Sequence, residues 1–135
     1  MIGLIIITHG HFGRELLRTA EDIVGRQGHA VALSVTSEMG IDNLSAALES
    51  AFKTIDAPEG CLILVDMIGG TPCNSALLKT RSLPHEVVSG VNLYMMISSF
   101  THRQMLDLKA LATRVMEDGR KSIVLPKELL LKRLG

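Results

Sequence analysis

Short apolar runs alternate with amphipathic stretches along most of the chain. The runs at residues 4–7 and 61–65 contain no polar residue, which is typical of strands buried on both faces of a parallel sheet. Further runs predict strands at 30–35, 86–91 and 122–125. In the intervals, apolar residues recur with a helical period and predict helices near residues 14–24, 41–55, 72–78, 92–97, 106–119 and 126–135.

This alternation of strand and helix favours an α/β fold, with an open, mainly parallel, doubly wound sheet and helices on both faces. We expect the common strand order 2-1-3-4, extended by a C-terminal strand at 122–125. The connections are short, and no repeat or linker interrupts the pattern. Residues 1–135 are therefore expected to form a single domain.

The composition narrows the class of protein. Hydrophobic residues make up 47% of the chain and aromatic residues only 3%, so the core is expected to be aliphatic. The 14 basic and 14 acidic residues cancel, which gives no electrostatic reason to expect nucleic acid or an anionic membrane as a partner. Cys61 and Cys73 lack a metal-type spacing and favour a reducing, cytoplasmic setting over a disulfide framework. The first apolar run is too short for a membrane span and lacks the charged leader of a signal peptide.

Polar residues follow the first and third predicted strands. Thr8-His9-Gly10 ends the first strand, and Asp66 follows the third. In a sheet of order 2-1-3-4 these strands are neighbours, and ligands bind in the crevice outside their carboxyl ends. We therefore expect His9 and Asp66 to face each other. A carboxylate on one ring nitrogen would fix the tautomer and leave the other nitrogen free as a nucleophile.

A glycine-rich turn, Gly69-Gly70-Thr71-Pro72, comes soon after Asp66. Thr71 is a favourable N-cap, and Pro72 suits the first helical position, where its missing N–H costs nothing. The start of a helix offers backbone N–H groups and a positive dipole end to an anion. A histidine nucleophile, an orienting carboxylate and an anion cradle together indicate a phosphorylated histidine at His9.

Each of these features also has an ordinary structural explanation. A histidine at a strand end is more often a loop residue, an aspartate there is often an N-cap, and a Gly-Gly-Thr-Pro segment is usually just a turn. A metal site on His9, His11 and Asp66 lacks a further ligand, so His11 is interpreted as a rim residue that contacts a partner. Cys73 has no neighbouring base, and the glycine-rich stretch lacks the lysine of a P-loop. The remaining histidines are interpreted as surface residues: His29, His85 and His102.

Three segments resemble the enzyme IIA domain of the mannose family of the bacterial phosphoenolpyruvate:sugar phosphotransferase system. They are Ile7–Gly10, Leu64–Pro72 and Ser89–Leu93, in the same order and spacing, and the resemblance covers nearly the whole chain. It implies that His9 takes a phosphoryl group from the phosphocarrier protein HPr. His9 would pass it to a histidine on the IIB component for sugar uptake, with the membrane components IIC and IID involved indirectly.

The resemblance also implies roles for the surrounding residues. Asp66 would hold the imidazole through Nδ1 and leave Nε2 to be phosphorylated. Four residues would lie beside the phosphoryl group: Gly10, Gly69, Gly70 and Thr71. No metal, nucleotide or other cofactor is implied. Members of the family form homodimers in which the last strand crosses to the partner subunit, and residues 122–125 match that strand.

The chain departs from the family pattern in two places. It ends at Gly135 without a IIB domain, so we expect IIB to be a separate protein or absent. His11 and Phe12 follow the motif where other members vary, which leaves the partner preference open. Gly10 argues against a related branch that serves dihydroxyacetone kinases, because serine typically follows the histidine there.

Three hypotheses on function remain. The first is phosphotransfer for sugar uptake, and the second is a regulatory module whose phosphorylated His9 is read by an effector. The third is a flavodoxin-like binding domain without phosphotransfer. One tyrosine and no tryptophan make the chain poor in the aromatic residues that a flavin site uses. The sequence does not indicate which sugar would be carried.

Overall fold

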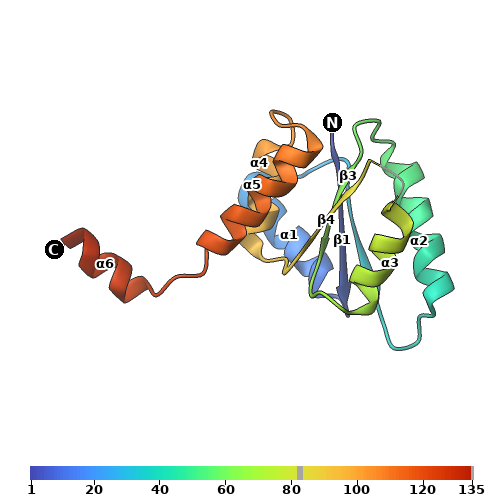
Figure 1. Cartoon of the computed structure of the whole chain (residues 1–135), viewed down its shortest axis with the longest axis horizontal. Helices are drawn as coiled ribbons and strands as arrows, with labels where there is room; N and C mark the ends of the chain where they lie inside the picture. Colours follow the sequence, from blue (N-terminus) through green and yellow to red (C-terminus); the bar gives the residue numbers. More distant parts are fainter. Residues whose placement is uncertain (82–83, 135) are drawn as a thin grey trace.

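The computed structural model describes residues 1–81 and 84–134, and it places a sheet of four strands between layers of helices (Figure 1). All strand pairings are parallel, and the order is β2-β1-β3-β4. The predicted fold class and the predicted order of these strands are confirmed. The strands are β1 (Gly3–His9), β2 (Ala30–Val35), β3 (Cys61–Val65) and β4 (Glu86–Ser89).

Helices cover both faces of the sheet (Figure 1). One face carries α2 (Ile41–Ile55) and α3 (Thr71–Thr80). The other face carries α1 (Phe12–Val24), α4 (Leu93–His102) and α5 (Leu108–Lys121). No helix within the described residues is long and apolar enough to cross a membrane.

The side chains of β1 supply two separate cores, because successive residues of a strand point to opposite faces. Ile5 and Ile7 pack against α2 and α3, whereas Leu4 and Ile6 pack against α1, α4 and α5. All four are fully buried. This double burial explains why the first apolar run contains no polar position.

The helix starts lie within about two residues of the predicted ones, and side-chain caps fix two of them. Asn92 and Asp107 cap α4 and α5, and each side chain accepts a backbone N–H from three residues further on, at 3.0 and 2.9 Å. By contrast, α3 begins at Thr71 with Gly70 as its N-cap, so Thr71 is not the cap that the sequence predicted. The backbone of Gly70 packs directly against the His9 ring.

The fourth strand ends at Ser89 rather than at Val91 as predicted. Gly90 has φ 85°, a left-handed conformation that turns the chain out of the strand. The Val91 N–H still donates to the carbonyl oxygen of Val65 at 3.0 Å, so the connection to α4 stays close to β3.

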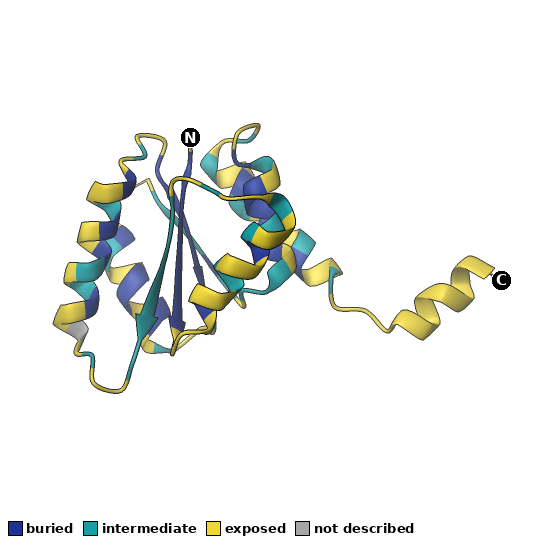
Figure 2. Cartoon of the chain, turned by 180° about the vertical axis from the view of Figure 1, so that it is seen from behind, coloured by how far each residue is buried: buried dark blue, intermediate teal, exposed yellow. Residues whose placement is uncertain are grey.

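Residues 122–125 form no strand within this single chain, so they do not extend its sheet as predicted, while exchange of the segment between subunits stays a prediction. The segment leaves the end of α5 and leads to α6 (Pro126–Leu134), which stands away from the body (Figures 1 and 2). A strand needs a neighbour to satisfy its backbone groups, and this segment is not part of the sheet. Its apolar side chains are exposed, with Ile123 at 81% and Leu125 at 66%. The predicted terminal helix is confirmed as far as Leu134, and Gly135 lies outside the described residues.

Candidate functional site

His9 and Asp66 meet at the carboxyl edge of the sheet. Strands β1 and β3 pair in parallel up to Ile7 and Val65, so the residues that follow lie side by side. Asp66 Oδ2 accepts two hydrogen bonds from His9, one from its backbone N–H at 2.8 Å and one from its ring Nδ1 at 2.7 Å. The other carboxylate oxygen accepts the Met67 N–H at 2.9 Å. The structure thus brings together the two residues that the sequence placed at neighbouring strand ends.

The carboxylate of Asp66 sets the state of the imidazole. Burial by itself would raise the pKa of Asp66, but the hydrogen bonds and charge of His9 and the Met67 N–H outweigh burial and hold that pKa below its usual value. An ionised carboxylate only accepts hydrogen bonds, so the proton between the two groups sits on Nδ1. In the neutral form of the ring, the lone pair is therefore on Nε2. The His9 side chain is 48% exposed and that of Asp66 only 10%, so the ring stays accessible while its partner is shielded.

Gly70 lies directly against the His9 ring. A Cβ added at Gly70 would be 2.7 Å from His9 Cε1 and 3.4 Å from Nε2, so only glycine leaves room for the ring. This contact sets the start of α3 beside Nε2. The positive end of a helix dipole stabilises nearby negative charge. A phosphoryl group on Nε2 would therefore meet the N-terminus of α3.

The other residues expected beside a phosphoryl group lie at the same edge, with one correction. Gly69 and Thr71 flank Gly70 and are exposed. The Gly10 N–H, however, is not free for an anion, because it donates to the carbonyl oxygen of Val35 at 2.8 Å. Gly10 has φ 61°, and it shapes the turn that leads from His9 into α1.

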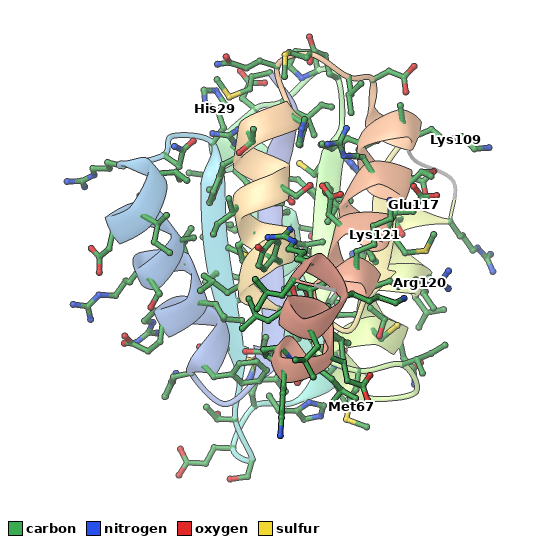
Figure 3. The ribbon with its side chains drawn as sticks, turned by 90° about the vertical axis from the view of Figure 1, so that its left-hand side faces the viewer. His29, Met67, Lys109, Glu117, Arg120 and Lys121 are labelled. Atoms are coloured by element: carbon green, nitrogen blue, oxygen red, sulfur yellow. The ribbon has the colours of Figure 1, made fainter. Side chains whose placement is uncertain are left out.

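Exposed apolar side chains lie close to His9 in the sequence and at the same sheet edge. Met67 and Ile68 follow Asp66 directly and are 56% and 78% exposed, and Phe12 at the start of α1 is 46% exposed. Figure 3 shows Met67 at the edge of the sheet opposite to that of His29. Exposed apolar surface near a reactive group suits the docking of another protein. Met67 and Ile68 were not among the predicted site residues, although two apolar residues soon after a strand end could have indicated a docking surface.

The remaining candidates are placed as follows. His11 is exposed just before α1, whereas Cys73 is buried in the first turn of α3. Among the described residues, no group of three or more His, Cys, Asp or Glu side chains could hold a metal ion. His85 is not the surface residue that was predicted. Its ring stacks on Phe52 with a centroid distance of 4.3 Å, and its Nδ1 accepts the Cys61 N–H at 2.9 Å.

Comparison with known proteins identifies the family of this chain. The family model described as PTS system fructose IIA component (EIIA-man) matches residues 3–116. The chain belongs to this family. Its fold is also that of a solved member, the phosphotransferase system component EIIA from Streptococcus agalactiae, with a TM-score of 0.84 and 29% identity. That alignment covers 95% of this chain and 99% of the Streptococcus chain.

Curated relatives of this IIA chain differ in length. The PTS system fructose-specific EIIA component of Bacillus subtilis (strain 168) is 30% identical over 133 residues, which is 98% of this chain and 91% of the relative. The PTS system mannose-specific EIIAB component of Escherichia coli (strain K12) is 30% identical over 127 residues, which is 90% of this chain. The chain spans only 39% of the length of that second relative.

Proposed function

We propose that the chain is a phosphocarrier of the sugar phosphotransferase system in which His9 accepts a phosphoryl group from phospho-HPr and donates it to a histidine of a IIB component. Membership of the IIA family supports the general role. The observation that carries the specific assignment is the double hydrogen bond from His9 to Asp66 Oδ2, at 2.8 and 2.7 Å. In the neutral tautomer that this bond favours, the lone pair lies on Nε2 of a half-exposed ring beside the start of α3.

The chemistry follows from the state of that ring. The Nε2 lone pair forms a bond to phosphorus while the bond from phosphorus to the donor's imidazole nitrogen breaks, and the electron pair returns to the donor ring. His9 then carries a proton on Nδ1 and phosphorus on Nε2, and the positive charge on its ring is balanced by Asp66. The α3 N-terminus stabilises the charge on the phosphoryl oxygens. Transfer to IIB reverses these steps.

The proposed function is tested by phosphorylating the purified protein with phosphoenolpyruvate, enzyme I and HPr, and then mapping the acid-labile phosphate. We expect label on His9 and none in His9→Ala. His11→Ala should reach the same final amount of label as the wild-type protein, even if contact of His11 with a partner changes the rate. His11 is a matched control because it is an exposed histidine on the same turn. Absence of label on the folded wild-type protein, or label retained in His9→Ala, would refute the assignment. Label that no IIB component accepts would favour the regulatory module.

We also propose that residues 122–125 pair with the sheet of a second copy of the chain. Strand β4 pairs only with β3 among the described residues, so its outer edge is open to another strand. A groove of about 510 Å³ runs along this edge, lined in part by Ile68, Ser89 and Ile123. The exposed apolar side chains of residues 123–125 would be covered there, while they are left in solvent in a single chain.

Light scattering in solution tests this second proposal. We expect a dimer for the wild-type protein and a monomer for Val124→Asp, because a charge in a paired apolar segment would be costly to bury. Leu134→Asp is the matched control, since this leucine is 84% exposed at the end of α6, beyond the proposed strand. A wild-type monomer at high protein concentration would exclude this pairing of residues 122–125 with a second copy.

A further inference from the structure

Thr8 is a buried polar residue immediately before His9. It is fully buried, and its side chain points to the opposite side of β1 from that of His9, because side chains alternate along a strand. The hydroxyl has two partners. Its Oγ1 accepts the N–H of Gly13 at 3.0 Å and donates to the carbonyl oxygen of Gly10 at 3.4 Å. One hydroxyl therefore ties together both ends of the turn that follows His9.

The first turn of α1 is built around this hydroxyl. The N-cap residue, His11, makes no side-chain cap hydrogen bond, so the Gly13 N–H relies on Thr8 for its acceptor. A Cβ added at Gly13 would lie 2.7 Å from Thr8 Oγ1 and 2.9 Å from Thr8 Cγ2. Glycine at position 13 thus lets the helix backbone pack directly onto the threonine.

The same turn determines where His9 sits relative to Asp66. Asp66 Oδ2 receives the backbone N–H and the ring Nδ1–H of His9 at once, so the ring bond depends on the position of the backbone. On the other side of His9 along the chain, the Gly10 N–H donates to the carbonyl oxygen of Val35. If the turn moves, the two bonds from His9 can no longer converge on one oxygen.

We propose that Thr8 is a positioning residue for the phosphorylation of His9. Its hydroxyl holds the turn in the conformation in which the backbone and ring of His9 converge on Asp66 Oδ2, with Nε2 presented to the phosphoryl donor. This inference rests on the proposed function, because it concerns the rate of the same transfer.

The first experiment compares Thr8→Val with Thr8→Ser. Valine keeps the shape of threonine and removes both hydrogen bonds, whereas serine keeps the hydroxyl. We expect the rate of His9 phosphorylation by phospho-HPr to fall about 10- to 100-fold in Thr8→Val, because displacement of a reacting group by about 1 Å has effects of this size. Thr8→Ser should restore the rate to within about threefold of wild type.

Thr80→Val is the matched control for loss of a buried hydroxyl. Thr80 is also buried, and its hydroxyl donates to the carbonyl oxygen of Ala76 at 2.7 Å, but it lies at the far end of α3 from His9. It should lose stability without losing phosphorylation rate. Equal rates for Thr8→Val and wild type, with both proteins folded, would overturn the positioning role.

A second pair of variants covers the case in which Thr8→Val does not fold. Gly13→Ala leaves Thr8 in place but pushes a methyl group against its hydroxyl, and it should slow phosphorylation in the same way. Gly28→Ala is the control, because a Cβ there meets no atom within 4 Å. A normal rate in Gly13→Ala would contradict the proposal.

Nitrogen NMR of the His9 ring separates this inference from the proposed function. In the wild-type protein we expect the tautomer with the proton on Nδ1, and in Thr8→Val a mixture of tautomers, because the bond to Asp66 is weakened. If wild-type protein takes no phosphate, the proposed function fails, and the ring spectrum still decides whether Thr8 positions His9. An unchanged ring spectrum in Thr8→Val would refute the positioning role even if wild-type His9 is phosphorylated.

Discussion

The side chains of His9 and Arg103 lie at opposite edges of the same sheet, and their surroundings differ. His9 at the carboxyl edge is half exposed, and its ring makes one hydrogen bond, to Asp66. Arg103 at the amino edge is only 3% exposed, and its guanidinium is surrounded by oxygen acceptors. These acceptors are the carbonyl oxygens of Ile2, His29 and Gly28, at 3.4, 3.1 and 2.6 Å, and Oε1 of Gln27, at 3.1 Å.

The difference separates a structural group, Arg103, from the group that we propose to be reactive, His9. At the amino edge, the protein supplies the partners of the guanidinium and excludes water, so Arg103 serves to join the ends of the strands. At the carboxyl edge, the protein fixes one ring nitrogen and leaves the other for a reactant. Changes at the amino edge should therefore affect stability, whereas changes at the carboxyl edge should affect the rate of transfer.

The largest expected effect is on stability, from Arg103→Met. This change removes the Arg103 donor from the carbonyl oxygens of Ile2 and Gly28, whereas that of His29 keeps the N–H of Leu4. We expect the free energy of unfolding to fall by about 3 kcal/mol, measured by urea denaturation. The phosphorylation rate of the folded fraction should be unchanged. Arg114→Met is the control, because Arg114 is 50% exposed and pairs with Asp118 at the surface. It should change stability by less than about 1 kcal/mol. A slower transfer in folded Arg103→Met would contradict the separation of the two edges.

The next effect is on rate, from Asp66→Asn. An asparagine no longer balances the charge that the ring acquires, so we expect phosphorylation of His9 to slow about 100-fold, measured in a rapid-mixing assay with phospho-HPr. Asp118→Asn provides the control. Asp118 also has a pKa held below its usual value, first by the hydrogen bond from Ser98, but it lies on α5. Equal slowing in both variants would mean that Asp66 acts only through general stability.

A smaller effect on rate is expected from Gly70→Ala. Its methyl group would push the His9 ring from its place, and we expect transfer to slow about tenfold. Gly40→Ala is a close control. Gly40 is the N-cap of α2 with φ −81° and ψ 166°, nearly the same as φ −85° and ψ 169° at Gly70, but a Cβ there meets no atom within 4 Å. An unchanged rate in Gly70→Ala would show that the ring adjusts without cost.

The smallest effect is a dependence of stability on pH that arises from His85. Burial lowers the pKa of His85 below its usual value near 6.5, so the unfolded chain binds a proton more readily than the folded protein. Stability should therefore fall as the pH is lowered from about 6.5 towards the folded-state pKa, since protonation removes the acceptor for the Cys61 N–H.

His85→Gln isolates this effect. The amide oxygen can still accept a hydrogen bond but does not titrate, so the variant should lose less stability than wild type between about pH 7 and pH 5, measured by urea denaturation. The rest of the chain is identical in the two proteins, so its contribution cancels in the difference. Parallel pH profiles for the two proteins would refute the role of His85.

Some parts of this molecule were predictable because their causes are local. The run Leu4–Ile7 has no polar position, so it had to be a strand covered on both faces. Parallel neighbours bring their carboxyl ends together, so the placement of His9 and Asp66 followed from the strand order. The terminal helix and the helix that starts after Asn92 likewise followed from nearby residues.

Other parts depend on contacts between residues far apart in the chain. Gly70 packs against the His9 ring although 61 residues separate them, and the ring of His85 is half-buried against Phe52. The segment 122–125 has the composition of a strand, but within a single chain it has no neighbour to pair with. Its conformation therefore depends on whether a neighbouring strand is present, rather than on its intrinsic strand propensity.

The sequence by itself determined the alternation of strands and helices, the order of the sheet and the pair of polar residues at neighbouring strand ends, because periodicity and chain direction suffice for these. Only the tertiary structure decided that one oxygen of Asp66 accepts both the backbone and the ring of His9, how closely Gly70 approaches the ring, and that Thr8 supports the turn from within the core. These features depend on distances of a few tenths of an ångström between distant segments, and such distances are set by the packing of the whole fold.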